Sequence, residues 1–163
     1  MTSRIILIDW IMNLSNKLNI LARTFESAIE IFDDYRVLAK IEPEYYAGII
    51  LLCVGISLKI NEPGFDKWND IYGLINNETR VYIPQVEYCI LQSINWQILR
   101  KTPFYFINNA ITNKLFKKNS ENIQKIFTLI DTCYFSDIFS KYASEIVVYA
   151  SLNILDRKST RLN

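Results

Sequence analysis

Apolar side chains recur at every third or fourth position along most of this chain of 163 residues. The first segment shows the period simply, because Leu7, Ile11, Leu14 and Leu18 would share one face of a helix. A strand would instead alternate at every second position. Only four glycines and four prolines interrupt the pattern. The spacing therefore predicts an all-α protein.

The same period predicts four more helices before residue 102, at about 23–38, 43–59, 65–75 and 82–96. The helix at about 43–59 is apolar on nearly every side, which is typical of a helix surrounded by others. Its longest uncharged run has about 14 residues, whereas a membrane-spanning helix needs about 20. We therefore expect a core helix, with its most inaccessible residues at Ile50, Leu51, Cys53 and Val54.

The second part of the chain partly repeats the first. Thr102 and Pro103 are typical of an N-cap and a first helical residue, so a new unit begins there. The pattern of Phe25–Asp33 recurs at Ile123–Asp131, and YYAGIILLCVGISL is echoed by KYASEIVVYASLNIL. Two matches in the same order favour duplication over coincidence. The predicted organisation is a first box at 1–101, a partial repeat of about three helices at 102–155 and a basic tail at 156–163.

Because this repeat lacks counterparts of two helices, we expect an exposed apolar surface around Val147, Val148 and Leu152. Such a surface would favour self-association.

Composition excludes several kinds of site. The chain has no histidine and no set of nucleophile, base and orienting group, so we expect neither an enzyme nor a bound metal or cofactor. Cys53, Cys89 and Cys133 lie far apart in apolar stretches and are interpreted as core residues in a reducing compartment. No signal peptide or membrane span is evident, so an intracellular protein of the nucleus or cytoplasm is expected.

The charge balance argues against a nucleic-acid partner. Eighteen basic and 17 acidic residues leave a net charge of +1, and the basic clusters at 114–118 and 157–161 are short. A protein that binds DNA needs a basic stripe to neutralise phosphates. Promoter bridging by a helical transcription factor is therefore not favoured.

Arg4 is an unusual residue for the face that it occupies. It precedes Leu7 and Ile8 by three and four positions, so it projects on the side of the core stripe. A guanidinium there needs a carboxylate partner, because an unpaired buried charge is costly. Asp33 follows the apolar Ile29 by four positions and is the candidate. We predict a structural ion pair between the first two helices.

Five stretches also carry a family resemblance. RIILIDWI, TFESAIEIFDDY, ISLKINE, VEYCILQSINWQIL and TPFYF resemble, in order and spacing, the signature stretches of the cyclin box of cell-cycle cyclins. The resemblance covers a first box at about 4–102 and three helices of a second. It implies a cyclin fold, with a five-helix box followed by a partial helical repeat. It also implies a regulatory subunit that binds and activates a cyclin-dependent protein kinase.

The resemblance implies that Lys59 and Glu87 bind the kinase directly. Apolar neighbours support this role, because Ile56 and Ile60 share a helical face with Lys59, and Leu91 shares one with Glu87. The alternative is that both charges are simply solvated at helix ends. The full expected set of kinase-binding residues is Lys59, Glu87, Ile56, Ile60, Glu62, Leu91 and Ile98.

The family also has a groove that docks kinase substrates or inhibitors, to which Ile6, Trp10, Asn13, Tyr46 and Ala47 correspond. Ile6 and Trp10 fit that groove. Asn13 replaces an acidic residue, and Tyr46-Ala47 replaces a Leu-Gln pair, so recognition of a basic peptide is in question. Trp10 as a half-buried packing residue is an equal alternative, and a scaffold that binds a kinase without activating it also stays open.

Overall fold

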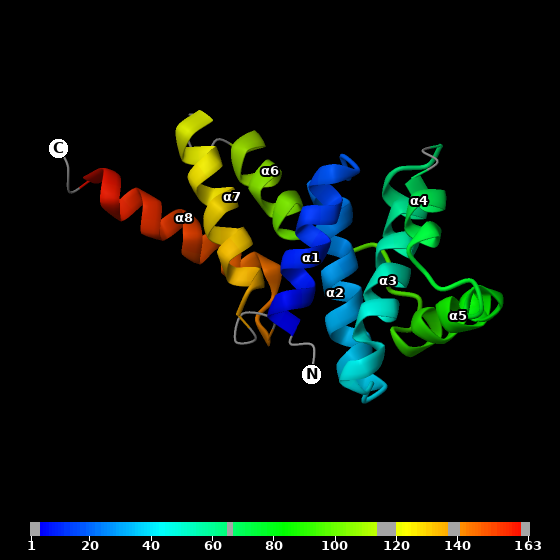
Figure 1. Ribbon diagram of the computed structural model, residues 1–163. Helices are drawn as coiled ribbons and strands as arrows, with labels where there is room; N and C mark the ends of the chain where they lie inside the picture. The colour runs from blue at the N-terminus through cyan, green and yellow to red at the C-terminus, as the bar shows by residue number, and fades with distance from the viewer. Residues whose placement is uncertain (1–3, 65–66, 114–119, 137–140, 161–163) are drawn as a thin grey trace. The chain divides into compact units, whose positions relative to one another are not determined.

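The computed structural model describes residues 4–64, 67–113, 120–136 and 141–160, apart from the side chains of residues 120 and 156–160. These residues form eight α-helices and no strand, which confirms the all-α prediction. The chain divides into two compact units, Met1–Arg100 and Lys101–Asn163 (Figure 1). Each unit is described by itself below.

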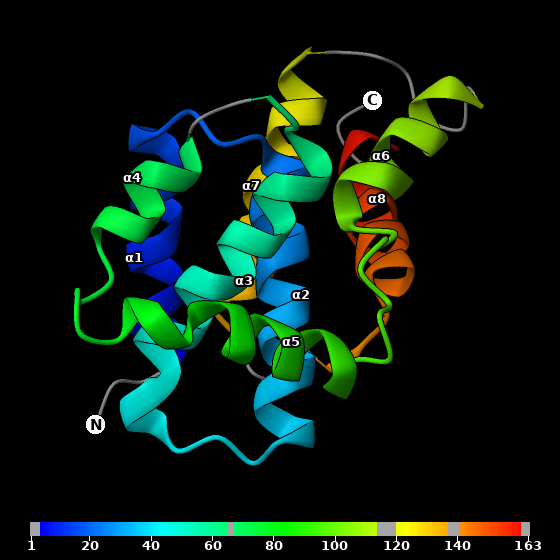
Figure 2. The same ribbon diagram turned by 90° about the vertical axis from the view of Figure 1, so that its right-hand side faces the viewer.

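The first unit is built around one central helix. α3 packs against α1, α2, α4 and α5, and its longest contact is with α2, which runs beside it (Figure 1). α5 lies across α3 and also touches α2 (Figure 2). Short 3₁₀ turns at Pro43–Tyr45 and Arg80–Tyr82 precede α3 and α5. The bounds are α1 Arg4–Lys17, α2 Ala22–Leu38, α3 Tyr46–Asn61, α4 Lys67–Gly73 and α5 Ile83–Ser93.

α3 is the core helix that its composition predicts. Every residue from Ile49 to Leu58 is buried, and the four positions expected to be inaccessible are at most 4% exposed. With the preceding 3₁₀ turn, the helical stretch Pro43–Asn61 has 19 residues and would pass for a membrane span by length and composition alone. Its apolar residues are instead covered by the neighbouring helices, as expected for a core helix of a folded domain.

Some helix ends and one cysteine differ from the predictions. α4 is described from Lys67 to Gly73, and the predicted start at residue 65 lies outside the described residues. α5 ends at Ser93 rather than residue 96, because Asn95 and Trp96 take positive φ angles of 52° and 59° that a helix cannot continue. Cys89 is exposed, so the expectation that all three cysteines lie in the core is wrong.

The second unit contains α6 Pro103–Thr112, α7 Ser120–Tyr134 and α8 Ser144–Thr160. Thr102 is the extended N-cap of α6, and Pro103 lies in its first turn, as the sequence predicts. α8 packs against α6 and α7 around a core of Ile107, Ile126, Ile130 and Val148. α8 continues to Thr160, so the backbone of the expected tail at 156–163 is helical for most of its length. The basic cluster 114–118, residue 161 and the side chains of 157–160 lie outside the described residues.

The expected apolar surface of α8 was assigned to the wrong face. Val147 and Val148 are buried, and Leu152 packs against the core of the second unit. The large apolar residues of α8 that are exposed, among those whose side chains are described, are Ile146 and Ile154, which are 57% and 50% accessible. These positions are eight apart, so they lie on one side of the helix, away from α6 and α7.

Candidate functional site

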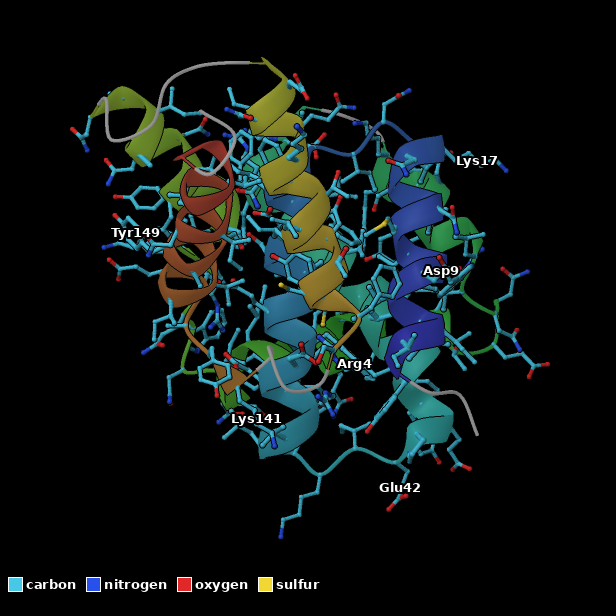
Figure 3. The ribbon with its side chains drawn as sticks, turned by 90° about the vertical axis from the view of Figure 1, so that its left-hand side faces the viewer. Arg4, Asp9, Lys17, Glu42, Lys141 and Tyr149 are labelled. Atoms are coloured by element: carbon cyan, nitrogen blue, oxygen red, sulfur yellow. The ribbon has the colours of Figure 1, made fainter. Side chains whose placement is uncertain are left out.

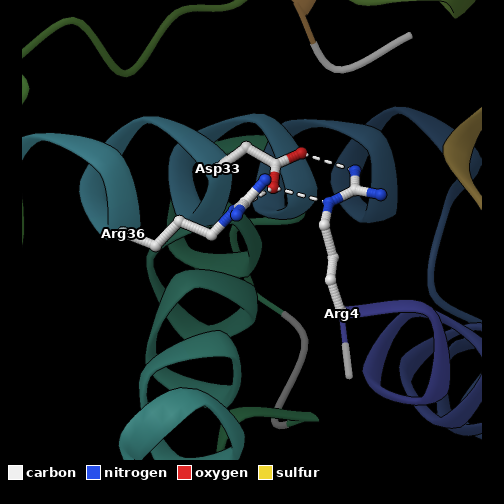
Figure 4. A network of polar contacts seen from close by, with 3 residues as sticks. All are labelled: Arg4, Asp33 and Arg36. Carbon is white, nitrogen blue, oxygen red and sulfur yellow. Dashed lines mark hydrogen bonds and ion pairs between the residues drawn. The ribbon is translucent and has the colours of Figure 1, made fainter. Parts of the chain in front are cut away.

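Arg4 and Asp33 join α1 to α2 through a two-point ion pair. Arg4 Nε donates to Asp33 Oδ1 at 2.7 Å and its Nη2 donates to Oδ2 at 2.6 Å (Figure 4). Arg36 Nε also donates to Asp33 Oδ1, at 2.8 Å. The Arg4 side chain is only 4% exposed. Arg4 begins α1, and Lys17 lies at the other end of that helix (Figure 3). The arginine on the core face therefore has a structural role.

Lys59 and Glu87 meet at the surface of the first unit. Lys59 Nζ lies 2.9 Å from Glu87 Oε1 and 2.8 Å from Oε2, so the ammonium bridges both carboxylate oxygens. Lys59 lies in the last turn of α3, where a positive charge interacts favourably with the helix dipole. The Lys59 side chain is 45% exposed and that of Glu87 is 14% exposed. The two residues therefore neutralise each other in the free chain.

A third side chain completes this group. Lys59 Nζ lies 4.2 Å from the centre of a Trp68 ring, within the range of a cation–π contact. Trp68 belongs to α4, and its ring occupies the space where a Cβ on Gly55 of α3 would lie. Tyr72 also belongs to α4. The pKa of its hydroxyl is raised, mainly because the group is partly buried and to a smaller extent because Glu87 is negatively charged. α3, α4 and α5 therefore meet at Lys59.

Trp68 and Gly55 are not among the site residues predicted from the sequence. Gly55 precedes Lys59 by four positions and therefore lies on the same face of α3. A glycine inside a helix that is otherwise strongly apolar is a signal of close approach by another group. The identity of that group could not be found from the spacing alone.

The apolar neighbours divide into two kinds. Ile60, Leu91 and Ile98 are partly exposed, so they are available to a partner. Ile56 is only 4% exposed and belongs to the core. In the free chain its side chain is therefore covered rather than exposed beside Lys59, and its contact with a kinase stays a prediction.

Glu62 is also buried, and it has partners within the first unit. It is 5% exposed, and its carboxylate accepts the Leu21 amide at 2.9 Å and Lys67 Nζ at 2.8 Å. Burial opposes the charged form, but Lys67 and the Leu21 amide outweigh it and lower the pKa of Glu62. Its oxygens therefore link the start of α2 to the end of α3 and the start of α4, and its kinase contact stays a prediction.

The residues expected to form a docking groove lie on α1 and at the start of α3. Ile6 and Trp10 are 59% and 37% exposed, and Asn13 is exposed one turn further along. Asn13 Nδ2 donates to the Asp9 carbonyl of its own helix at 2.9 Å. On α3, Ala47 is exposed and the Tyr46 ring packs edge-on against Phe32. The three residues on α1 share an accessible face, whereas part of the Tyr46 ring is covered by its contact with Phe32.

Lys59 and Glu87 lie on a surface that mixes charged and apolar side chains. Within the described ranges, no three His, Cys, Asp or Glu side chains gather in a way that could hold a metal. Lys59 and Glu87 instead offer a positive and a negative group side by side, with partly exposed aliphatic residues near them. Such a mixture of apolar area and a few polar groups is typical of a protein–protein interface.

The comparison with protein families identifies the first unit. The family described as "Cyclin, N-terminal domain" matches residues 1–99, which correspond to the first unit. The chain belongs to the cyclin family. The all-α fold of the first unit is accordingly that of a cyclin box, and Lys59 and Glu87 lie within it on α3 and α5.

A viral protein is similar over nearly the whole chain. It is named a putative serine/threonine-protein kinase of Acanthamoeba polyphaga mimivirus, and it is 26% identical over 159 residues. The alignment covers 94% of this chain and 28% of the relative. The chain therefore spans little more than a quarter of the length of that relative.

Proposed function

We propose that this chain is a regulatory subunit that binds and activates a cyclin-dependent protein kinase of the nucleus or cytoplasm. In this proposal phosphoryl transfer belongs to the kinase, and the cyclin box supplies the binding surface. The observation that carries it is the meeting of Lys59 and Glu87, 28 positions apart, at the surface of a cyclin box. The mimivirus relative, whose name is that of a kinase, supports the class of partner.

The energetic argument depends on what happens to this pair on binding. In the free chain Lys59 is half-exposed, so water weakens its attraction to Glu87. A kinase that covers both groups and offers further hydrogen-bond partners would desolvate them. Loss of one member of a desolvated charged pair costs about 2–5 kcal/mol, or roughly 30-fold to several-thousand-fold in affinity.

The test is co-purification with a panel of cyclin-dependent kinases, each expressed without a cyclin, followed by phosphorylation of histone. The double variant Lys59→Ala with Glu87→Ala should lose binding and activation. A matched control is Lys125→Ala with Glu121→Ala, which removes an exposed pair on α7 whose atoms lie 2.6 Å apart. Both double variants should lower the free energy of unfolding by less than about 1 kcal/mol, as exposed pairs do.

The outcomes separate the alternatives. Binding without stimulation of histone phosphorylation would indicate a scaffold rather than an activator. Undiminished activation by the Lys59/Glu87 double variant would refute the proposed surface. An unfolded double variant would show that the pair is structural.

The exposed α1 face supports a second contact within the same proposal. Ile6 and Trp10 could hold an apolar segment of a kinase substrate or inhibitor. Ile6→Ala with Trp10→Ala should then weaken phosphorylation of substrates that dock, while histone phosphorylation stays unchanged. Equal rates on all substrates would leave Trp10 with a packing role alone.

A further inference from the structure

A lysine at a surface is usually mobile, because its four-carbon stem has many rotamers. Lys59 is held on two sides. Its ammonium bridges both oxygens of Glu87, and it lies over a Trp68 ring whose centre is 4.2 Å from Nζ. These contacts come from α5 and α4, so the position of the ammonium depends on both helices.

The place of the Trp68 ring is built into α3. Gly55 is buried, and a Cβ on it would overlap with the ring atoms Cζ3 and Cη2 of Trp68. The absence of a side chain at Gly55 therefore lets the indole lie directly on the α3 backbone, one helical turn before Lys59. The ring is thus fixed against a rigid surface, rather than packed loosely among other side chains.

We propose that Trp68 is a positioning residue for Lys59, which holds the ammonium beside Glu87 where a kinase would meet it. This role rests on the function proposed above. A preordered lysine loses less rotamer freedom on binding, so affinity rises without any contact between Trp68 and the kinase. Trp68 would therefore influence binding only through Lys59.

The first test needs no kinase. In the free chain with ¹³C-labelled lysine, the ring current of Trp68 should shift the ε-methylene protons of Lys59 upfield from those of the other lysines. Trp68→Leu should remove this shift, and Trp68→Phe, which keeps an aromatic face, should keep part of it. An unshifted Lys59 signal in the unsubstituted chain would overturn the positioning role.

The second test is a double-mutant cycle on binding to the kinase that co-purifies. Trp68→Leu should weaken binding roughly 2- to 30-fold, the range that cation–π contacts span from exposed to desolvated sites. Trp68→Phe should restore part of the loss. In a Lys59→Met background, the same Trp68→Leu change should have almost no effect, because the group that it positions is gone. A residue that only stabilises the fold would give equal losses in both backgrounds.

The two proposals fail in different ways. If Lys59→Met leaves kinase binding unchanged, the proposed binding surface is wrong, and any role of Trp68 in binding falls with it. If Lys59→Met weakens binding but Trp68→Leu does not, or does so equally in both backgrounds, only the positioning role is overturned.

Discussion

Substitution of Gly55 by alanine should destabilise the protein, although alanine favours helices. In the interior of a helix, alanine is more favourable than glycine by about 0.8–1.0 kcal/mol. At Gly55 the added Cβ would overlap with three ring atoms of Trp68, so the indole must leave its place on α3. Overpacking of this kind costs about 1–3 kcal/mol. We therefore expect a net loss of about 1 kcal/mol for Gly55→Ala.

Gly48 provides the control within the same helix. It is exposed in the first turn of α3, and a Cβ there would meet no atom within 4 Å. Gly48→Ala should therefore stabilise the protein by about 0.5–1 kcal/mol. The difference between the two substitutions isolates the overlap with Trp68, because the gain in helix propensity is common to both.

The assay is urea unfolding followed by far-ultraviolet circular dichroism, with a third comparison in a Trp68→Ala background. There the Cβ has room, so Gly55→Ala should become stabilising, and the two residues should show a coupling of about 1–3 kcal/mol. A Gly55→Ala variant as stable as Gly48→Ala in the unsubstituted chain would refute the close approach of Trp68 to α3.

Three further predictions concern stability. Asp33→Ala should cost about 3 kcal/mol in urea unfolding, because it leaves the buried Arg4 guanidinium without its carboxylate. A cost below about 0.5 kcal/mol would be the behaviour of a surface pair. The lowered pKa of Glu62 means that its stabilising contribution is complete above the unfolded value of about 4.5 and is lost as the pH falls through the lower folded pKa. The gap in unfolding free energy between the unsubstituted chain and Glu62→Gln should accordingly shrink on acidification, and a gap independent of pH would contradict this. In the second unit, Ile130→Ala should cost about 2–5 kcal/mol, whereas Ile154→Ala on the exposed face of α8 should stay within about 0.5 kcal/mol. Equal losses in thermal unfolding would show that the exposed face of α8 is wrongly assigned.

The sequence by itself determined the class of fold and the central helix. The three-to-four-residue spacing of apolar positions predicts most of the helices. α3 is apolar on so many sides that it must be surrounded by other helices. The same period placed Arg4 on a core face, and a buried guanidinium requires a carboxylate such as that of Asp33. Lys59 and Glu87 were selected by the resemblance to the cyclin box, since spacing alone favours the interpretation that both charges are simply solvated.

Only the tertiary structure decided which faces are covered. A helix that is apolar on several sides contains no period that distinguishes the inner face from the outer one, so neither the burial of Ile56 nor the exposed side of α8 could be predicted. The contacts of Glu62 with Leu21 and of Lys59 with Trp68 could not be predicted from the sequence for a different reason. Leu21 lies 41 positions from Glu62, and Trp68 belongs to another helix than Lys59. Contacts of this kind depend on how α3, α4 and the start of α2 pack in space, which local spacing does not encode.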